Sequence, residues 1–291
     1  MDHHLDKYGL MQGEQRGARE RCSGKIDNLL IDRMVCQESR RSKRNLSMAW
    51  INERKAYDSV DHKWLKEIMI LRKFLQWLSR MVQRISTRWN TQINARKNQV
   101  SETIKFNKGL QQGDTLYPRL FTLCINPIAW KLKAAKGYRL SKPISKKITD
   151  LLYIDDLKNF AASQEKLGTV LRSTKSAMAD AGLQWNERKC AVTHVKRGGL
   201  DTKSAEIEVE ESEVITSLKE GTYYKFLGFM ENVKQEDSQV LKCAAKVYLQ
   251  RISVIWSSPL SDFYEIMASN QFALPILSYL MWTQVWPIAE L

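Results

Sequence analysis

Two adjacent aspartates, Asp155 and Asp156, are the residues of this chain whose surroundings best suit a chemical role. Apolar residues flank the pair, from Leu151 to Ile154 on one side and at Leu157 on the other. Adjacent carboxylates repel each other, so a cation most readily keeps them together at an apolar site, and hard oxygen ligands favour Mg²⁺. Asp-Asp pairs are also common in exposed turns, so the pair alone leaves a plain turn open.

A short hairpin is predicted to carry the pair at its tip. Ile148-Thr149 before the acids and Asn159-Phe160 after them have the composition of its two arms. The mostly apolar run Leu46–Ile51 predicts another strand, buried on both faces.

Apolar residues at helical spacing predict helices over residues 25–38, 64–69, 75–85 and 163–182. Ser163 is expected to cap the last of these and Gly182 to end it. Residues 1–24 read as an irregular lead-in, residues 191–195 as a strand, residues around 207–215 as a peripheral hairpin, and residues from 235 onward as helical.

The segment Lys108–Pro118 is a second candidate site. Its two glycines, Gly109 and Gly113, allow a ligand to approach the backbone closely, Asp114 or Thr115 can cap a helix, and Pro118 suits its first turn. Pro127 is expected to kink or interrupt that helix. Taken alone, the glycine spacing is also typical of an ordinary loop.

The composition fits a soluble protein of one or two domains with a polyanionic partner. The chain has 291 residues, and its 46 lysines and arginines against 32 aspartates and glutamates give a net charge of +14. Five widely spaced cysteines with no Cys-x-x-Cys pair indicate neither a disulfide framework nor a zinc site, which favours an intracellular location, nuclear or cytoplasmic. No apolar run reaches transmembrane length and no targeting signal is found, so no membrane partner is expected.

Several blocks, taken together and in order, resemble the reverse transcriptase domain of non-LTR (LINE-type) retrotransposons. Tyr153-Ile154-Asp155-Asp156 looks like the Tyr-x-Asp-Asp box of reverse transcriptases, and the segment Asn52–His62 resembles their first catalytic block. Three further blocks resemble the family in the same order: Gln112-Gly113, residues 182–190 with Lys189 at a basic position, and Leu227-Gly228 within residues 223–229.

The resemblance implies an α+β right-hand polymerase, with an antiparallel palm sheet packed on helices and with fingers and thumb. Partial fingers would cover residues 1–45, the palm 46–234 with a finger insertion at about 66–107, and a partial helical thumb 235–291. It also implies an enzyme that extends a DNA primer on an RNA template from deoxynucleoside triphosphates, by a reaction that uses two Mg²⁺ or Mn²⁺ ions.

The resemblance also assigns roles to residues. Asp155 and Asp156 would bind the metal and be catalytic, and Lys189 would place a cation near the leaving pyrophosphate. Tyr57, Gln112 and Gly113 would bind the nucleotide, with Tyr57 as a steric gate against a 2′-hydroxyl. Leu227 and Gly228 would grip the primer.

This sequence departs from the family at one catalytic position and at its two ends. Asn52 stands where the family usually has an aspartate, no finger block of the Arg-Pro-Ile type precedes Gln15, and the thumb is incomplete. We therefore expect a truncated domain with a degenerate first catalytic block and impaired activity. Two alternatives are a catalytically silent nucleic-acid-binding remnant and a basic structural protein with a fortuitous Asp-Asp turn.

Overall fold

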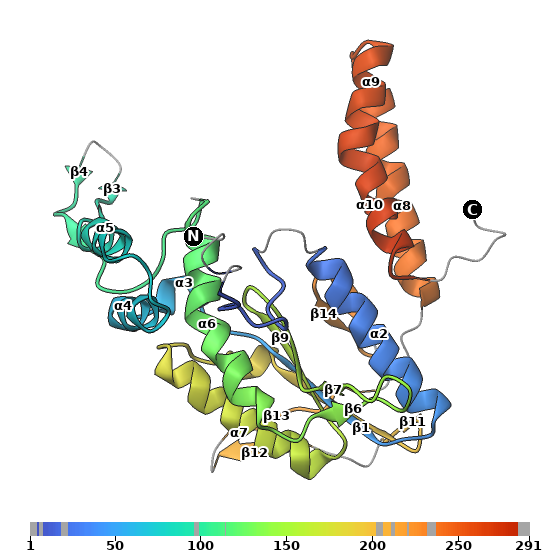
Figure 1. Ribbon diagram of the computed structural model, residues 1–291. Coiled ribbons are helices and arrows are strands. Elements are labelled where there is room, and N and C mark those ends of the chain that lie inside the picture. The colour runs from blue at the N-terminus through green and yellow to red at the C-terminus, as the bar shows by residue number, and fades with distance from the viewer. Residues whose placement is uncertain are drawn as a thin grey trace.

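A five-stranded antiparallel sheet lies at the centre of the computed structural model (Figure 1). The structure describes residue 5 and residues 8–18, 23–95, 99–113, 115–201, 206–210, 213–219, 221–231 and 237–284. In spatial order the strands are β11 (Gly199–Leu200), β10 (Ala191–Lys196), β1 (Leu46–Ile51), β9 (Asp156–Ala161) and β8 (Asp150–Tyr153).

The sheet is covered by helices on both faces. Helices α6 (Tyr117–Lys133) and α7 (Gln164–Asp180) lie on one face and α2 (Lys25–Arg41) on the other (Figure 1). All six residues of β1 are buried, and they alternate between the two cores, with Ala49 and Ile51 on the α6 and α7 side and Leu46 and Met48 on the α2 side. The predicted strand buried on both faces is confirmed.

The helix ends follow local sequence signals in part. Ser163 caps α7 by accepting a hydrogen bond from the Lys166 N–H at 3.3 Å, as predicted, and α7 ends two residues before Gly182. Helix α2 extends to Arg41, three residues beyond the predicted end.

Helix α6 has Pro118 in its first turn as expected, but two other expectations at this helix differ from the structure. Its N-cap is Leu116, so the Thr115 hydroxyl does not cap it, and Asp114 lies outside the described residues. Pro127 also does not interrupt the helix, because buried residues on both sides of the proline, Cys124 and Ile128 among them, hold it against the core. The expected kink stays a prediction.

The remaining elements extend from the sheet on two sides (Figure 1). On one side are the helices α3 (Ala56–Ser59), α4 (His62–Leu71) and α5 (Gln76–Thr87), with the short hairpins formed by β2 (Asn90–Thr91) with β5 (Ile104–Lys105) and by β3 (Asn94–Ala95) with β4 (Gln99–Val100). On the other side stands a helical arm of α8 (Asp237–Trp256), α9 (Asp262–Ala268), a π-helical turn (Ser269–Ala273) and α10 (Leu274–Met281).

Three further hairpins and one short helix complete the described elements. The hairpins are β6 (Tyr138–Arg139) with β7 (Lys147–Ile148), β12 (Ile207–Glu210) with β13 (Glu213–Ile215), and β14 (Tyr224–Phe226) with β15 (Phe229–Glu231). A 3₁₀ helix spans Glu187–Lys189. Over the part of the chain that the structure describes, no helix has the length and apolar character needed to span a bilayer.

Candidate active site

The two aspartates lie at the tip of the hairpin formed by β8 and β9, as predicted. Tyr153 pairs with Asp156, which leaves Ile154 and Asp155 as a two-residue turn. Ile154 has φ +55°, a left-handed conformation that costs a β-branched residue roughly 1–3 kcal/mol. The tip is therefore a strained turn that the surrounding structure must hold in place.

The two carboxyl groups resist ionisation because of where they lie. Partial burial raises the pKa of Asp156 to about 6, and the charge of Asp155 adds to this effect. Partial burial also raises the pKa of Asp155. The Lys25 ammonium, at the start of α2, lowers the pKa of both groups and so partly offsets the burial. The tip is thus a place where a positive charge is stabilised.

Asn52 lies across from Asp156 on the neighbouring strand. Ile51 pairs with Leu157, so the next residue of the β1 chain faces the residue before Leu157. The Asn52 backbone is fixed from the other side, because its N–H donates to Cys190 Sγ at 3.4 Å and its carbonyl accepts from the Asn186 N–H at 2.8 Å. The structure therefore brings position 52 to the aspartate tip, with an amide in place of a carboxylate.

The neighbouring carboxyl group, Glu53, does not occupy that position. Side chains alternate along an extended segment, which predicts that Glu53 and Asn52 project to opposite faces, and Glu53 itself pairs with Trp185. It is buried at 8% exposure, and neither of its carboxyl oxygens has a hydrogen-bond partner. Burial raises its pKa well above the usual range, and the charges of Asp155 and Asp156 raise it further. Both effects favour the neutral acid of Glu53 over its carboxylate.

Tyr57 and the glycine-containing loop at 108–113 lie next to each other. The Tyr57 carbonyl accepts from the Leu110 N–H at 2.8 Å, and the Tyr57 ring stacks on Phe121 with centroids 4.5 Å apart. Burial, followed by the charge of Asp155, raises the pKa of Tyr57 to about 12. A Cβ at Gly109 would lie 2.9 Å from the Asp58 carbonyl oxygen, so this contact requires glycine.

Gln112 and Gly113 are exposed on the loop that follows Gly109. Gln112 lines a pocket of about 640 Å³, together with Asp58, Trp89 and Phe106 among others. The Tyr57 backbone therefore contacts the loop that carries Gln112, and the charge of Asp155 acts on the Tyr57 hydroxyl.

Lys189 and the Leu227–Gly228 turn belong to two other elements of the chain. Lys189 is exposed at the end of its 3₁₀ helix, directly before Cys190, which contacts Asn52. Leu227 and Gly228, with φ of +50° and +88°, form the turn between β14 and β15. The Tyr279 hydroxyl of α10 donates to the Leu227 carbonyl at 2.8 Å and so holds this strained turn.

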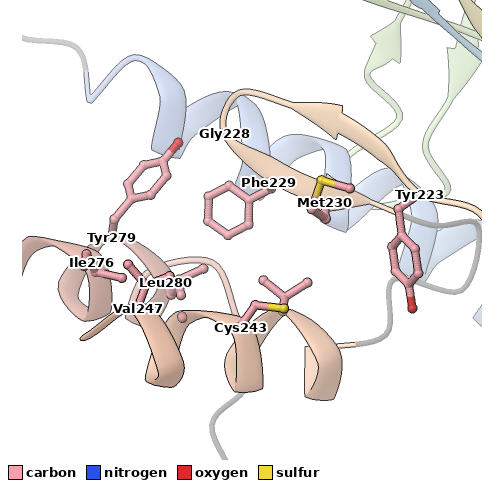
Figure 2. A pocket seen from close by; sticks show the side chains of 11 residues that line it. Tyr223, Gly228, Phe229, Met230, Cys243, Val247, Ile276, Tyr279 and Leu280 are labelled. Carbon is pink, nitrogen blue, oxygen red and sulfur yellow. The ribbon is translucent and has the colours of Figure 1, made fainter. Parts of the chain in front are cut away.

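An apolar pocket of about 370 Å³ separates the β14–β15 hairpin from the helical arm (Figure 2). Gly228, Phe229 and Met230 line it from the hairpin side. The arm contributes side chains of α8 and α10, namely Val240, Cys243, Ala244, Val247, Ile276, Tyr279 and Leu280. The hairpin and the arm are therefore in contact where Tyr279 bonds to Leu227, and the pocket lies between them.

Sequence reasoning missed the residues that brace the tip. Gln15 is fully buried, its Oε1 accepts from the Ile154 N–H at 3.1 Å, and a Cβ at Gly17 would come within 2.5 Å of Ile154 N. The segment around Gln15 also bonds to β8, through Arg16 N–H to the Leu152 carbonyl at 3.1 Å. In the sequence, the only sign of this brace is Gly17, two residues after Gln15. Nothing in the sequence marks Lys25 as a residue that acts on the tip.

The donors at the tip fit a divalent cation only in part. Asp155 and Asp156 offer hard carboxylate oxygens, whereas Asn52 offers a neutral amide oxygen. Within the described residues, no three His, Cys, Asp or Glu side chains are grouped so that they could hold a metal ion. The tip therefore offers two carboxyl groups, and position 52 adds an amide where a third carboxyl group could stand.

The chain is similar to parts of two longer retrotransposon proteins. The R2 retrotransposable element Pol polyprotein of Nasonia vitripennis (type 1) is 24% identical over 276 residues, covering 93% of this chain and 26% of its own length. That of the element R2DM of Drosophila melanogaster (type 2) is 27% identical over 209 residues, covering 70% and 19%. This chain therefore spans about a quarter or less of the length of these relatives.

Solved structures and a family profile agree with the architecture. Apo telomerase from Candida tropicalis superposes with a TM-score of 0.56 at 12% identity, covering 96% of this chain and 49% of that one. The telomerase of the same organism in complex with a fragment of telomeric RNA gives 0.52 at 12% identity, covering 88% and 41%. These likenesses confirm the polymerase fold. The profile of the family described as "Reverse transcriptase (RNA-dependent DNA polymerase)" matches residues 2–230, most of the chain, and the chain therefore belongs to the reverse transcriptase family.

Proposed function

We propose that this chain is a domain of an R2-type non-LTR retrotransposon that extends a DNA primer on an RNA template, and that its activity is low. The observation that carries the proposal is the register of β1 on β9, in which Ile51, directly before Asn52, pairs with Leu157, directly after Asp156. The aspartate pair supports the polymerase reaction, and the amide at position 52 supports its impairment.

The hairpin carboxylates would hold the metal. Asp155 and Asp156 are the proposed ligands of Mg²⁺ or Mn²⁺, and the ion, when bound, would neutralise negative charge that builds up on the triphosphate. Asn52 would contribute only a neutral amide oxygen, which is a poorer ligand for a hard dication.

The other site residues would position the substrates. Tyr57, half-buried and stacked on Phe121, is the proposed steric gate, and Gln112 and Gly113 the proposed nucleotide-binding residues. Lys189 is exposed directly before Cys190, which contacts Asn52, and it is the proposed cation for the leaving pyrophosphate. The turn at Leu227–Gly228 would contact the primer end.

The fold supports a division into the three parts of a right-hand polymerase. We assign residues 46–234, which contain the whole five-stranded sheet, to the palm, with a finger insertion at about 66–107. Residues 1–45 would belong to the fingers. Residues 235–291, of which 237–284 are described and form the helical arm, would belong to the thumb.

The charge of the chain supports nucleic acid as its partner. A net charge of +14 favours binding through phosphates, so the affinity for an RNA template with a DNA primer should fall steeply with salt. Binding measured by fluorescence anisotropy over a range of salt concentrations checks this. A logarithm of affinity that stays flat against the logarithm of salt concentration would show that the binding is not electrostatic.

The decisive test compares this chain with its Asn52→Asp variant. Loss of one metal-binding carboxylate removes several kcal/mol of transition-state stabilisation, so the variant should extend primers on the order of a thousand times faster. Both proteins are assayed by primer extension as fusions to an intact finger segment from a related element. The Asp155→Asn form of the fast variant is the control and should return to background.

The same assay separates the proposal from the second candidate, a catalytically silent remnant that still binds nucleic acid. A remnant would bind primer and template without extending them in either form. Equal and robust extension by both forms would instead show that the asparagine at position 52 is harmless.

A further inference from the structure

A buried lysine between two acids lies on one strand of the aspartate hairpin. Lys158, on β9, is 1% exposed, and its Nζ lies 2.7 Å from a carboxylate oxygen of Asp32 on α2 and 2.7 Å from Glu231 Oε2 on β15. The indole N–H of Trp50, on β1, donates to the same Glu231 oxygen at 3.0 Å. Four elements therefore meet at one ammonium group.

Burying these charged groups in the core costs free energy of desolvation. The Lys158 ammonium lies 4.5 Å from the centre of the Trp50 ring and 5.3 Å from that of Phe226, in surroundings that an apolar side chain would also fill. Buried ion pairs are often no more stable than apolar residues of the same shape, although removing one partner is strongly destabilising. The charged groups instead fix orientation, because each hydrogen bond holds one element in a defined position relative to another.

The element that depends on this direction is the β14–β15 hairpin. It forms a two-stranded sheet of its own and is not part of the hydrogen-bonded ladder of the five-stranded sheet. Its place on the sheet is set by side chains at one end, where Tyr224 pairs with Glu231, and both contact Trp50, Tyr224 by stacking with centroids 5.2 Å apart.

The same bonds connect two turns of the candidate active site. Lys158 lies two residues after Asp156 on β9, so both side chains project from the same face of the sheet. Glu231 ends the strand that begins at Phe229, directly after the Leu227–Gly228 turn. The contact between Lys158 and Glu231 thus links the hairpin of the aspartate pair to the hairpin of the Leu227–Gly228 turn.

We propose that Lys158 and Glu231 are positioning residues, which fix the Leu227–Gly228 turn relative to Asp155 and Asp156 and so place a primer end at the aspartate tip. The proposal rests on the proposed function for the identity of the bound molecule. The mechanical part, that this contact holds the hairpin, stands on the distances alone.

The experiment compares two variants that each replace one buried carboxyl group of the sheet region with an amide. Glu231→Gln weakens the contact with Lys158, and Asp150→Asn is the matched control, since Asp150 is 4% exposed and lies on β8, away from the β14–β15 hairpin. Hydrogen exchange is measured over residues 221–231 and 150–161. Affinity is measured by anisotropy for an RNA template paired with a DNA primer and for the template alone.

We expect Glu231→Gln to speed exchange in 221–231 selectively. It should weaken binding of the paired primer on the order of tenfold, because the carboxyl group that accepts from both Lys158 and Trp50 has become an amide, while template affinity stays unchanged. Asp150→Asn should do neither. A role in general stability alone would lower both affinities together.

Unchanged exchange in residues 221–231, or equal exchange in both variants, would overturn the proposal. Selective loosening in a chain that binds no primer and template would uphold the mechanical role and reject the proposed function. If Glu231→Gln does not fold, Trp50→Phe takes its place in the experiment. This variant keeps an aromatic ring at position 50 but removes the N–H that donates to Glu231. It should speed exchange in the same hairpin.

Discussion

Replacing Gln15 with leucine should loosen the aspartate tip while leaving the chain folded. Gln15 Oε1 accepts from the Gly17 N–H at 2.8 Å and from the Ile154 N–H at 3.1 Å, and its Nε2 donates to the Ile154 carbonyl at 3.4 Å. These bonds hold a residue whose φ of +55° is unfavourable for isoleucine. Without them, the turn that carries Asp155 loses the side chain that fixes it.

The size of the effect follows from the burial of each bond. The Gly17 N–H is buried and costs about 1–3 kcal/mol when left without a partner, whereas the Ile154 N–H is part-buried and costs about 1 kcal/mol. The buried leucine side chain offsets about 1 kcal/mol. The free energy of unfolding should therefore fall by roughly 1–3 kcal/mol, which an ordinary domain tolerates.

Urea unfolding gives the free energy, and Mn²⁺ titration of the folded variant gives the effect on the tip. Asn126→Leu is the matched control, because Asn126 is also a fully buried amide that braces the lead-in, by accepting from Gln12 N–H at 2.9 Å and donating to the Leu10 carbonyl at 3.1 Å. Only the Gln15 variant should bind Mn²⁺ more weakly. A stability loss below about 0.5 kcal/mol, or equal weakening in the control, would refute the reasoning.

Three other predictions concern the acids. Replacing both Asp155 and Asp156 with alanine should abolish Mn²⁺ binding, measured by Mn²⁺ relaxation, with the fold retained by circular dichroism, and unchanged binding would exclude the site. Mn²⁺ affinity should rise as pH increases through about 6, because partial burial raises the pKa of Asp156 to about 6 and protons compete with the metal, so a flat titration would contradict the pKa. Burial raises the pKa of Asp150 to about 8, so the folded state holds more protons than the unfolded chain from about pH 4 upward, and the free energy of unfolding should fall as pH rises until about pH 8. Asp150→Asn should flatten that slope in urea unfolding at several pH values, and an unchanged slope would assign it to another group.

The sequence predicted the elements whose signals are local. The hairpin around Asp155 and Asp156, the β1 strand and the capped helix after Ser163 each depend on residues within a few positions of one another, and each is confirmed. The polymerase fold is confirmed as well, through the resemblance of ordered blocks. The roles of Tyr57 and Lys189 remain predictions.

The contacts that hold the site together join distant parts of the chain and leave no local pattern. Gln15 meets Ile154 across 139 positions, and Lys158 meets Asp32 across 126. A lysine in an apolar strand reads as an anomaly until its two acids are located, because nothing in the strand shows that a helix and a hairpin will each supply a carboxylate. Periodicity identifies which residues are buried, but not which buried polar groups are partners.

The asparagine at position 52 has opposite effects on stability and on metal binding. Partial burial already raises the pKa of Asp155 and Asp156, and the charge of Lys25 only partly offsets this effect. A third carboxylate at position 52 would therefore add repulsion at the tip. Asn52→Asp should therefore lower the free energy of unfolding by roughly 1–3 kcal/mol without divalent cations. Because a cation binds the folded state and stabilises it by mass action, millimolar Mn²⁺ should restore more stability to the aspartate form than to the native chain. Urea unfolding with and without Mn²⁺ measures both differences. An aspartate form as stable as the native chain in chelator would mean that position 52 lies too far from the aspartates to share a metal with them, and the low activity would then need another cause.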